Sequence, residues 1–263
     1  MLTFGPPPNR KENFTWEYVD TTGEYHRHVD TPLHFYQSTV GYSTKDYFSL
    51  VNDPRNPYQT VLKVQHLGNI AIEKGVRPVK YLNVSADTLR KTAADMIKAG
   101  HAVFFGCDVG KFSEITGAGK DGGWLDSNQS SKGLFNYPLI LGDDVGTGNT
   151  FDKGERLRMG ETLMTHAMVF TGVHIVDGKY VRWRVENSWG VESGEKGYLV
   201  MTDEWFGEYV YQVVTSENYV DRETGSLAVR AGLFGNAAVS DPAITKDKDI
   251  IELPVWDPMG SLA

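Results

Sequence analysis

Two polar residues in apolar, strand-like surroundings carry the chemistry that this sequence could perform. His166 lies in Thr-His-Ala-Met-Val-Phe (165–170), and Asn187 lies in Arg-Val-Glu-Asn-Ser-Trp-Gly (184–190). Their separation is enough for a strand, a turn and an antiparallel return strand. A histidine general base needs a partner that orients its ring, and an asparagine amide oxygen does this without adding a charge. We predict that Asn187 accepts a hydrogen bond from His166 and that Trp189 shields this bond from water.

The nucleophile that would complete such a set is missing, because the single cysteine lies in an unsuitable place. Cys107 belongs to His-Ala-Val-Phe-Phe-Gly-Cys-Asp-Val (101–109), an apolar run typical of a buried strand. Reactive cysteines have a helix N-terminus or nearby cations that lower the thiol pKa, whereas the Asp108 charge would raise it. We therefore expect Cys107 to be a structural residue.

The remaining histidines show no spacing typical of zinc ligands, and we expect no metal site. They are His26, His28, His34, His66, His101 and His174. We expect His174 to be exposed, beyond the strand that carries His166. A lone histidine beside an apolar strand is more often a core residue than a catalytic base. Asn187 and its sequence neighbours favour catalysis for His166.

Composition and charge exclude several classes of protein. The formal net charge is −8, and the short basic clusters at 77–80 and 156–158 are typical of a solvated surface, so we do not expect a nucleic-acid partner. No apolar stretch approaches the roughly 20 residues that span a bilayer, and the N-terminus lacks the features of a signal peptide. A single cysteine excludes an internal disulfide. This absence suits a reducing compartment, and we expect a cytoplasmic protein.

Periodicity and capping signals predict an α+β fold, with helices from the first half and an antiparallel, partly barrelled sheet from roughly 160–215. Residues 117–148 are rich in glycine and predict a flexible loop, with a weak helix or turn near 130–134. We expect strands at 14–19, 48–52, 101–109, 165–176, 180–187 and 197–202, a turn at 20–24, and helices at 85–99, 155–163 and 202–210, with a further helix start at Thr31.

Longer strings in the sequence resemble one family, the bleomycin hydrolases, which are papain-like cysteine peptidases. The resemblance runs from about Phe14 to the C-terminus and corresponds to the C-terminal part of the family's protein. The matching strings are Leu-Val-Asn-Asp-Pro-Arg (50–55), Phe-Gly-Cys-Asp-Val-Gly-Lys (105–111), Leu-Met-Thr-His-Ala-Met (163–168), Trp-Arg-Val-Glu-Asn-Ser-Trp-Gly (183–190), Gly-Tyr-Leu-Val-Met-Thr-Asp-Glu-Trp-Phe (197–206) and Trp-Asp-Pro-Met-Gly (256–260).

The resemblance implies the barrel half of the papain fold together with family-specific helical insertions. On this basis we expect an extended or disordered N-terminus (1–13), a helical or mixed insertion region (14–160), the barrel region with His166 and Asn187 (161–249) and a C-terminal tail that reaches the active-site cleft (250–263). In the tail, Trp256 would occupy an apolar pocket and the Ala263 carboxylate would lie near the substrate's α-ammonium group. Ser188 would simply occupy a strand position.

The resemblance also implies an activity. His166 and Asn187 would act with a cysteine on the missing N-terminal half, in a cytosolic aminopeptidase of broad specificity that also hydrolyses the bleomycin amide. The assembly would be a homohexamer, its substrates would be peptides, and no cofactor would be needed beyond a reduced thiol. Trp189 would line the leaving-group side of the site.

Two other hypotheses differ in class from an active peptidase. The chain could be a stand-alone binding or assembly module that has lost its nucleophile. It could also be an unrelated domain that matches the motifs by chance, although several strings match in the correct order. Loss of catalytic selection would let His166 and Asn187 drift, and both are intact, so we favour the peptidase.

Overall fold

A computed structural model describes residues 9–41, 43–65, 79–111, 113–114, 123–125, 151–191, 193–233 and 250–260. The chain forms two compact units, Met1–Thr44 and Lys45–Ala263. Within the described residues, no helix is both long enough and apolar enough to cross a membrane.

The smaller unit contains a β-hairpin at the predicted place. Strands β1 (Phe14–Val19) and β2 (Tyr25–Asp30) pair in antiparallel register. The Asp20 carboxylate closes the turn between them by accepting the backbone N–H groups of Thr22 and Glu24, both at 2.9 Å. An aspartate that accepts from the backbone two residues further on favours such a turn. The predictions of a strand at 14–19 and a turn at 20–24 are confirmed.

A short helix follows the hairpin and begins where its cap predicts. The Thr31 hydroxyl accepts the backbone N–H of His34, and α1 (Pro32–Phe35) begins with a proline, whose fixed φ suits the first turn. A single π-helical turn continues it over Tyr36–Val40. The Phe35 ring meets the edge of Trp16, which joins the helix to the hairpin.

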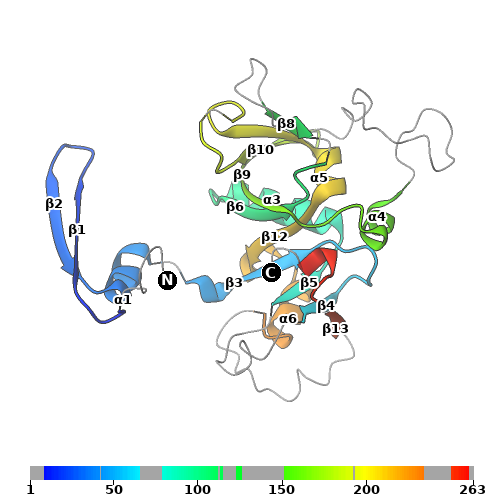
Figure 1. The fold of residues 1–263 in the computed structure, drawn as a ribbon, viewed down its shortest axis with the longest axis horizontal. Coiled ribbons are helices and arrows are strands. Elements are labelled where there is room, and N and C mark those ends of the chain that lie inside the picture. The colour runs from blue at the N-terminus through cyan, green and yellow to red at the C-terminus, as the bar shows by residue number, and fades with distance from the viewer. Residues whose placement is uncertain are drawn as a thin grey trace. The chain divides into compact units, whose positions relative to one another are not determined.

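The larger unit is built on a mixed sheet in which most neighbours are antiparallel. The parallel pairs are β3 with β5, β4 with β13, and β8 with β11. Figure 1 shows the order from β8 at the top of this unit to β13 at the bottom. In sheet order the strands are β13 (Ile250–Leu253), β4 (Thr60–Val64), β5 (Lys80–Asn83), β3 (Tyr47–Val51), β12 (Val210–Ser216), β6 (Val103–Cys107), β9 (His166–Val176), β10 (Lys179–Glu186), β11 (Tyr198–Thr202), β8 (Gly123–Leu125) and β7 (Ser113–Glu114).

Strands from both sides of residue 160 share this sheet. We expected 14–160 to be a helical or mixed insertion and the sheet to come from roughly 160–215. Instead β6 pairs with β12 on one side and with β9 on the other, and β3, β4 and β5 extend the sheet beyond β12. The apolar run 101–109 explains the central position of β6, because a strand with neighbours on both edges and packing on its faces needs few polar residues.

In the part of the larger unit that the structure describes, each α-helix begins at a side chain that caps it. The caps are Ser85, Asp152, Thr202 and Asp221, and each accepts the backbone N–H three residues later. The predicted helices at 85–99 and 202–210 are confirmed. The helix predicted at 155–163 begins and ends earlier, because Asp152 and Glu155 form a capping box and Gly160 ends the helix in the left-handed region (φ 71°). The helices are α3 (Ala86–Lys98), α4 (Lys153–Met159), α5 (Asp203–Tyr209) and α6 (Arg222–Arg230).

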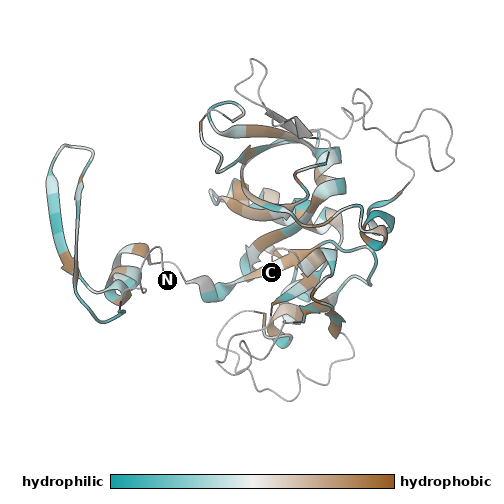
Figure 2. Cartoon of the chain, in the orientation of Figure 1, coloured by the Kyte–Doolittle hydropathy of each residue, from teal (hydrophilic) through white to brown (hydrophobic). Residues whose placement is uncertain are grey.

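Aromatic side chains from four elements form the centre of the hydrophobic core. Phe105 of β6 stacks on Phe170 of β9 with ring centroids 3.8 Å apart, and Trp183 of β10 lies 4.7 Å from Phe206 of α5. We call these four residues the aromatic core; none is more than 1% exposed. Figure 2 shows apolar residues in brown along the central strands. A second cluster consists of Val51, Leu62, Val64, Tyr81, Leu157, Met164, Tyr211, Leu253 and Met259.

Two local predictions are wrong in this unit. Arg156, expected on a solvated surface, is only 6% exposed, and it donates hydrogen bonds to the backbone oxygens of Phe151 and Glu208. Those carbonyls lie on neighbouring segments, which no local pattern of charges reveals. The glycine-rich stretch 117–148 contains strand β8, which pairs with β11; the rest of that stretch, 130–134 included, lies outside the described residues.

Candidate active site

The sheet brings His166 and Asn187 together as the sequence predicts. His166 is the first residue of β9, and Asn187 directly follows β10, the antiparallel neighbour of β9. The His166 Nε2 lies 3.0 Å from the Asn187 Oδ1. The same Oδ1 accepts the backbone N–H of Ser188 at 2.9 Å, which fixes the amide with its oxygen toward the ring. The imidazole therefore donates from Nε2, and Nδ1 is left for proton transfer.

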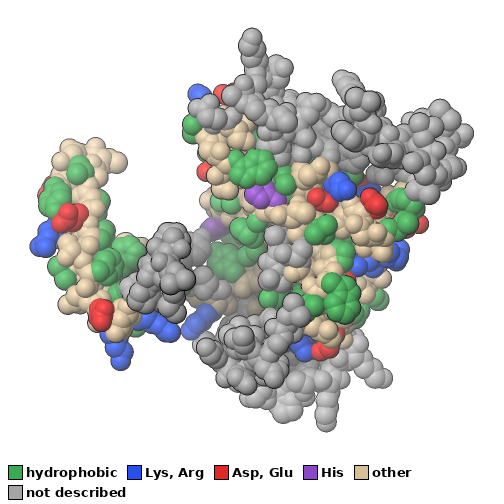
Figure 3. Space-filling model, viewed as in Figure 1, with side chains coloured by type: hydrophobic (Ala, Val, Ile, Leu, Met, Phe, Trp, Pro, Cys, Tyr) green, Lys and Arg blue, Asp and Glu red, His purple; other side chains and the backbone are tan. Residues whose placement is uncertain are grey.

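Trp189 lies beside the imidazole, as expected of a shield. Its ring centroid is 5.0 Å from that of His166, with the two planes 36° apart, while half of the side chain stays exposed. Figure 3 shows exposed hydrophobic side chains next to a histidine on this face of the larger unit. Ser188 lies beyond the end of β10 and is exposed, so the expected strand position is wrong. The bend that follows needs Gly194 (φ 63°), because a Cβ there would collide with the backbone oxygen of Tyr198.

A buried carboxylate holds the segment that leads into His166. Asp108, which is 3% exposed, accepts the Thr162 hydroxyl at 2.8 Å and the Leu163 backbone N–H at 3.3 Å. It also accepts the Thr165 hydroxyl at 3.3 Å, and the Thr165 backbone N–H donates to the Cys107 carbonyl at 3.0 Å. In the sequence, Asp108 stands out only as a neighbour of the Cys107 thiol. An aspartate at the end of an apolar strand is the signal that could have identified this role.

Cys107 has the environment of a core residue. It lies opposite His166 in the β6–β9 register, but its side chain is fully buried among the apolar residues of the core. Burial raises the pKa of its thiol well above the ordinary value, and the negative charge of Asp108 raises it further. The thiolate is the reactive form of cysteine. Cys107 therefore does not supply a nucleophile, as the sequence predicts.

The burial of Cys107 gives a first testable result. We expect iodoacetamide at pH 8 to leave the folded chain unmodified and to add a single label after denaturation, which intact-mass spectrometry would measure. Rapid labelling of the native protein would show that the thiol is accessible and would contradict its assignment to the core. Peptidase turnover that is abolished by labelling Cys107 would contradict it more strongly.

Comparison with known proteins establishes the family. The sequence pattern of the peptidase C1-like family matches residues 1–260. The chain belongs to that family. It is 43% identical to bleomycin hydrolase of Gallus gallus over 98% of its own length, and 38% identical to aminopeptidase C of Listeria innocua over 100%. The crystal structure of PepW from Lactobacillus rhamnosis HN001 superposes with a TM-score of 0.78, at 39% identity and with 99% of this chain covered.

This peptidase C1-like chain spans about half the length of the relatives it matches. It covers 50% of the Gallus gallus protein, 52% of the Listeria innocua protein and 51% of the PepW chain. The predicted resemblance to bleomycin hydrolases is confirmed. The predicted α+β, papain-like fold is confirmed as well.

The end of this peptidase C1-like chain differs from the sequence-based expectation. Trp256 is 82% exposed, so it does not anchor the tail in an apolar pocket of the chain. Met259, three residues later, is fully buried in the second cluster and takes that place. A tryptophan between two prolines predicts an anchor from composition alone, but burial depends on which side of the turn faces the sheet. Ala263 lies outside the described residues.

One group of possible metal ligands occurs within the described part of the chain, at the turn of the β1–β2 hairpin. Asp20, Glu24 and His26 each offer a ligand atom, and these atoms lie within 4.8 Å of one another. The Asp20 carboxylate already accepts two backbone N–H groups and the Thr22 hydroxyl, and it lies 3.0 Å from His26 Nε2. Closure of the turn accounts for this proximity. These contacts also lower the pKa of Asp20, with the Thr22 hydroxyl as the largest cause.

Proposed function

We propose that this chain is the C-terminal, histidine- and asparagine-bearing part of a papain-like cysteine aminopeptidase, which acts with a cysteine on a preceding half. The observation that carries the proposal is the 3.0 Å contact between His166 Nε2 and Asn187 Oδ1. Relatives named bleomycin hydrolase and aminopeptidase C support the activity class. We propose peptides and the bleomycin amide as substrates.

In the proposed reaction, each residue has a part in acyl transfer. The thiolate attacks the scissile carbonyl carbon and forms a C–S bond, while His166 delivers a proton from Nδ1 to the leaving amine as the C–N bond breaks. Water then attacks the thioester, His166 accepts a proton from it, and the C–S bond breaks to release the acid and regenerate the thiolate beside the protonated imidazole. Asn187 keeps the ring in one orientation through both steps because it holds Nε2.

An activity assay of the chain by itself tests whether the nucleophile lies on the preceding half. We expect no turnover of an aminoacyl reporter above background, because His166 and Asn187 lack a nucleophile and Cys107 is buried. Completion with a cysteine-bearing N-terminal half of a relative should produce turnover. Turnover by the chain alone would contradict the missing-nucleophile prediction.

The competing function is a binding or assembly module that has lost its nucleophile. The genomic sequence upstream of the codon for Met1 separates the two, since an in-frame Gln followed shortly by Cys-Trp supports the peptidase. A well-supported start site without that sequence supports the module. A completed chain that folds and yet gives no turnover would also favour the module.

We further propose a homohexamer in the cytoplasm. Membership of the family supports the assembly, and the single cysteine supports a reducing compartment. One relative, 38% identical, is named cysteine proteinase 1, mitochondrial, of Saccharomyces cerevisiae. Sedimentation of the completed enzyme tests the assembly, and fractionation of cells tests the location.

The C-terminal residues give a prediction about specificity. We propose that residues 261–263 lie in the cleft and that the Ala263 carboxylate pairs with the substrate's α-ammonium group. Removing Ser261, Leu262 and Ala263 from the completed enzyme should weaken the preference for a free N-terminus and allow cleavage of N-blocked peptides. The ratio of kcat/KM for a free and an acetylated substrate measures this. An unchanged ratio would show that the tail is only structural.

A further inference from the structure

The chain folds into a compact turn after β13, which we call the C-terminal turn (residues 254–260). The backbone N–H of Asp257 donates to the Pro254 carbonyl at 2.9 Å, and that of Gly260 donates to the Asp257 carbonyl at 2.8 Å. The Asp257 carboxylate accepts the Met259 backbone N–H at 2.9 Å. These bonds make Asp257 the centre of the turn.

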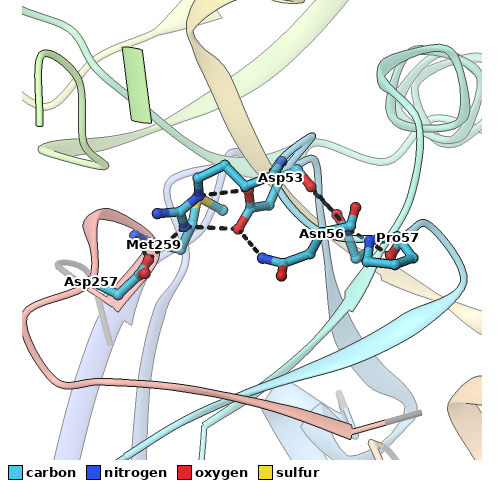
Figure 4. A network of polar contacts seen from close by, with 7 residues as sticks. Asp53, Asn56, Pro57, Asp257 and Met259 are labelled. Atoms are coloured by element: carbon cyan, nitrogen blue, oxygen red, sulfur yellow. Dashed lines mark hydrogen bonds and ion pairs between the residues drawn. The ribbon is translucent and has the colours of Figure 1, made fainter. Parts of the chain in front are cut away.

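Arg55 joins the C-terminal turn to a loop about 200 residues earlier in the chain. Its guanidinium donates twice to Asp53, from Nε to Oδ1 at 2.9 Å and from Nη2 to Oδ2 at 2.8 Å. The same Nη2 donates to the Asp257 Oδ1 at 2.8 Å. Figure 4 shows Asp53 and Asp257 on either side of this guanidinium. The side chain of Asp53 is fully buried, and those of Arg55 and Asp257 are 13% and 10% exposed.

The surroundings of Asp53 fix the direction in which Arg55 points. The Oδ1 of Asp53 also accepts the Arg55 backbone N–H at 3.0 Å, and the Oδ2 of Asp53 accepts the Asn56 side-chain amide at 2.9 Å (Figure 4). Asn83 accepts the Asp53 backbone N–H and donates to the Asp53 carbonyl, so the loop is tied to β5. A buried carboxylate with both oxygens occupied leaves the arginine fork one orientation. Arg55 therefore presents Nη2 to Asp257 from a rigid base.

The C-terminal turn in turn contacts the segment that leads into the candidate active site. The Met164 backbone N–H donates to the Pro258 carbonyl at 3.2 Å, and Met259 packs with Met164 in the second cluster. Met164 precedes His166 by two residues. The Asp108 contacts hold the same segment from the other side, at Thr162 and Thr165.

We propose that Arg55 is a positioning residue, which holds the C-terminal turn through Asp257 against the entry to β9. It thereby holds the turn up to Gly260 in place, and it supports the backbone that presents His166. We call the contact of Arg55 with Asp53 and Asp257 the clamp, because these three charged groups hold the C-terminal turn in place. The Met164 contact depends on that turn. Its consequence for substrate choice rests on the proposed function, whereas the clamp itself does not.

Variants at Asp257 test the clamp and leave the buried Asp53 carboxylate paired with Arg55. Asp257→Ala removes the oxygen Oδ1 that accepts from both the Arg55 Nη2 and the Met259 N–H, whereas Asp257→Asn removes the charge and keeps an oxygen for them. We expect Asp257→Ala to speed amide hydrogen exchange at Met164 and Gly260 about tenfold or more, relative to the amides of β6, with Asp257→Asn intermediate. Exchange is measured by NMR on the full chain or on the completed enzyme.

Asp95→Ala is the control, since Asp95 also pairs with a cation, Lys91 at 2.6 Å, but on α3. It should leave exchange at Met164 and Gly260, relative to β6, unchanged. The proposal is overturned if Asp257→Ala leaves both amides unchanged, if it speeds β6 by the same factor, or if Asp95→Ala has the same local effect.

The completed enzyme separates this proposal from the proposed function. There Asp257→Ala should lower the ratio of kcat/KM for a free and an acetylated N-terminus. Faster exchange with an unchanged ratio supports the clamp and overturns its part in specificity. Faster exchange in a completed protein without peptidase activity supports the clamp and contradicts the proposed function.

Discussion

In the peptidase completed with its cysteine-bearing half, His166→Ala should lower kcat/KM by about 10²–10⁴-fold, the usual contribution of a general acid–base group. In the proposed mechanism, His166 protonates the leaving amine and then accepts a proton from water. Alanine can do neither, while the sheet that carries it keeps its pairing. Stopped assays with an aminoacyl reporter measure the loss, and circular dichroism checks that the variant folds.

His174→Ala is the matched control, because His174 is an exposed histidine on the same strand, β9. Its predicted exposure is confirmed, although it lies within the strand rather than beyond it. We expect nearly unchanged activity from this variant. Near-normal activity of His166→Ala, or equal losses for His166→Ala and His174→Ala, would contradict the assigned role.

Asn187→Ala is expected to cost less, about 10²-fold or less, because Asn187 orients the ring but transfers no proton. The bond from His166 Nε2 and the bond from the Ser188 N–H both end on its Oδ1, so alanine releases the ring without removing it. A loss as large as that of His166→Ala would assign Asn187 a more direct role than positioning.

The parts of the fold that the sequence predicts correctly have short-range causes. Ser85, Thr202 and Thr31 each cap a helix that begins at the next residue, and the cap and the first turn are neighbours in the chain. The His166–Asn187 contact is of the same kind, because it joins adjacent strands of one hairpin. Residue types at these spacings contain the information directly.

The parts that the sequence does not predict depend on contacts between distant segments. β6 lies between β9 and β12, and no periodicity of the run 101–109 names its partners. Arg156 is buried because its guanidinium reaches the Glu208 carboxylate, at 2.5 Å, and two backbone carbonyls. The local charge pattern around Arg156, by contrast, indicates a solvated arginine.

The clamp shows the same limit at the candidate site. In the sequence, Asp53 and Arg55 look like an ordinary turn after a strand, and nothing near Asp257 names a partner for it. Their meeting requires the parallel pairing of β13 with β4, which directs the C-terminal turn back across the sheet. Asp108 is similar, since Thr162 and Thr165 are its partners only after β6 and β9 pair.

Trp183 lies within the hairpin that carries the candidate site, and its removal should have the largest effect on stability. It is fully buried in β10, with its ring 5.2 Å from Phe170 and 4.7 Å from Phe206. Its indole N–H donates to the Asp203 Oδ1 at 3.0 Å. The residue thus joins β9, β10 and α5, and Asn187, just beyond the end of β10, follows it by four positions.

Trp183→Ala should lower the free energy of unfolding by about 3–5 kcal/mol, as expected when a buried aromatic ring leaves a cavity. Trp183→Phe should cost less, because a ring still fills part of the site and only the bond to Asp203 is lost. Urea unfolding followed by far-UV circular dichroism measures both, independently of tryptophan fluorescence. Trp256→Ala is the control, since that side chain is 82% exposed and should change stability by no more than about 0.5 kcal/mol. Equal effects at the two tryptophans would place Trp183 outside the core and would remove the support that we assign to the His166–Asn187 hairpin.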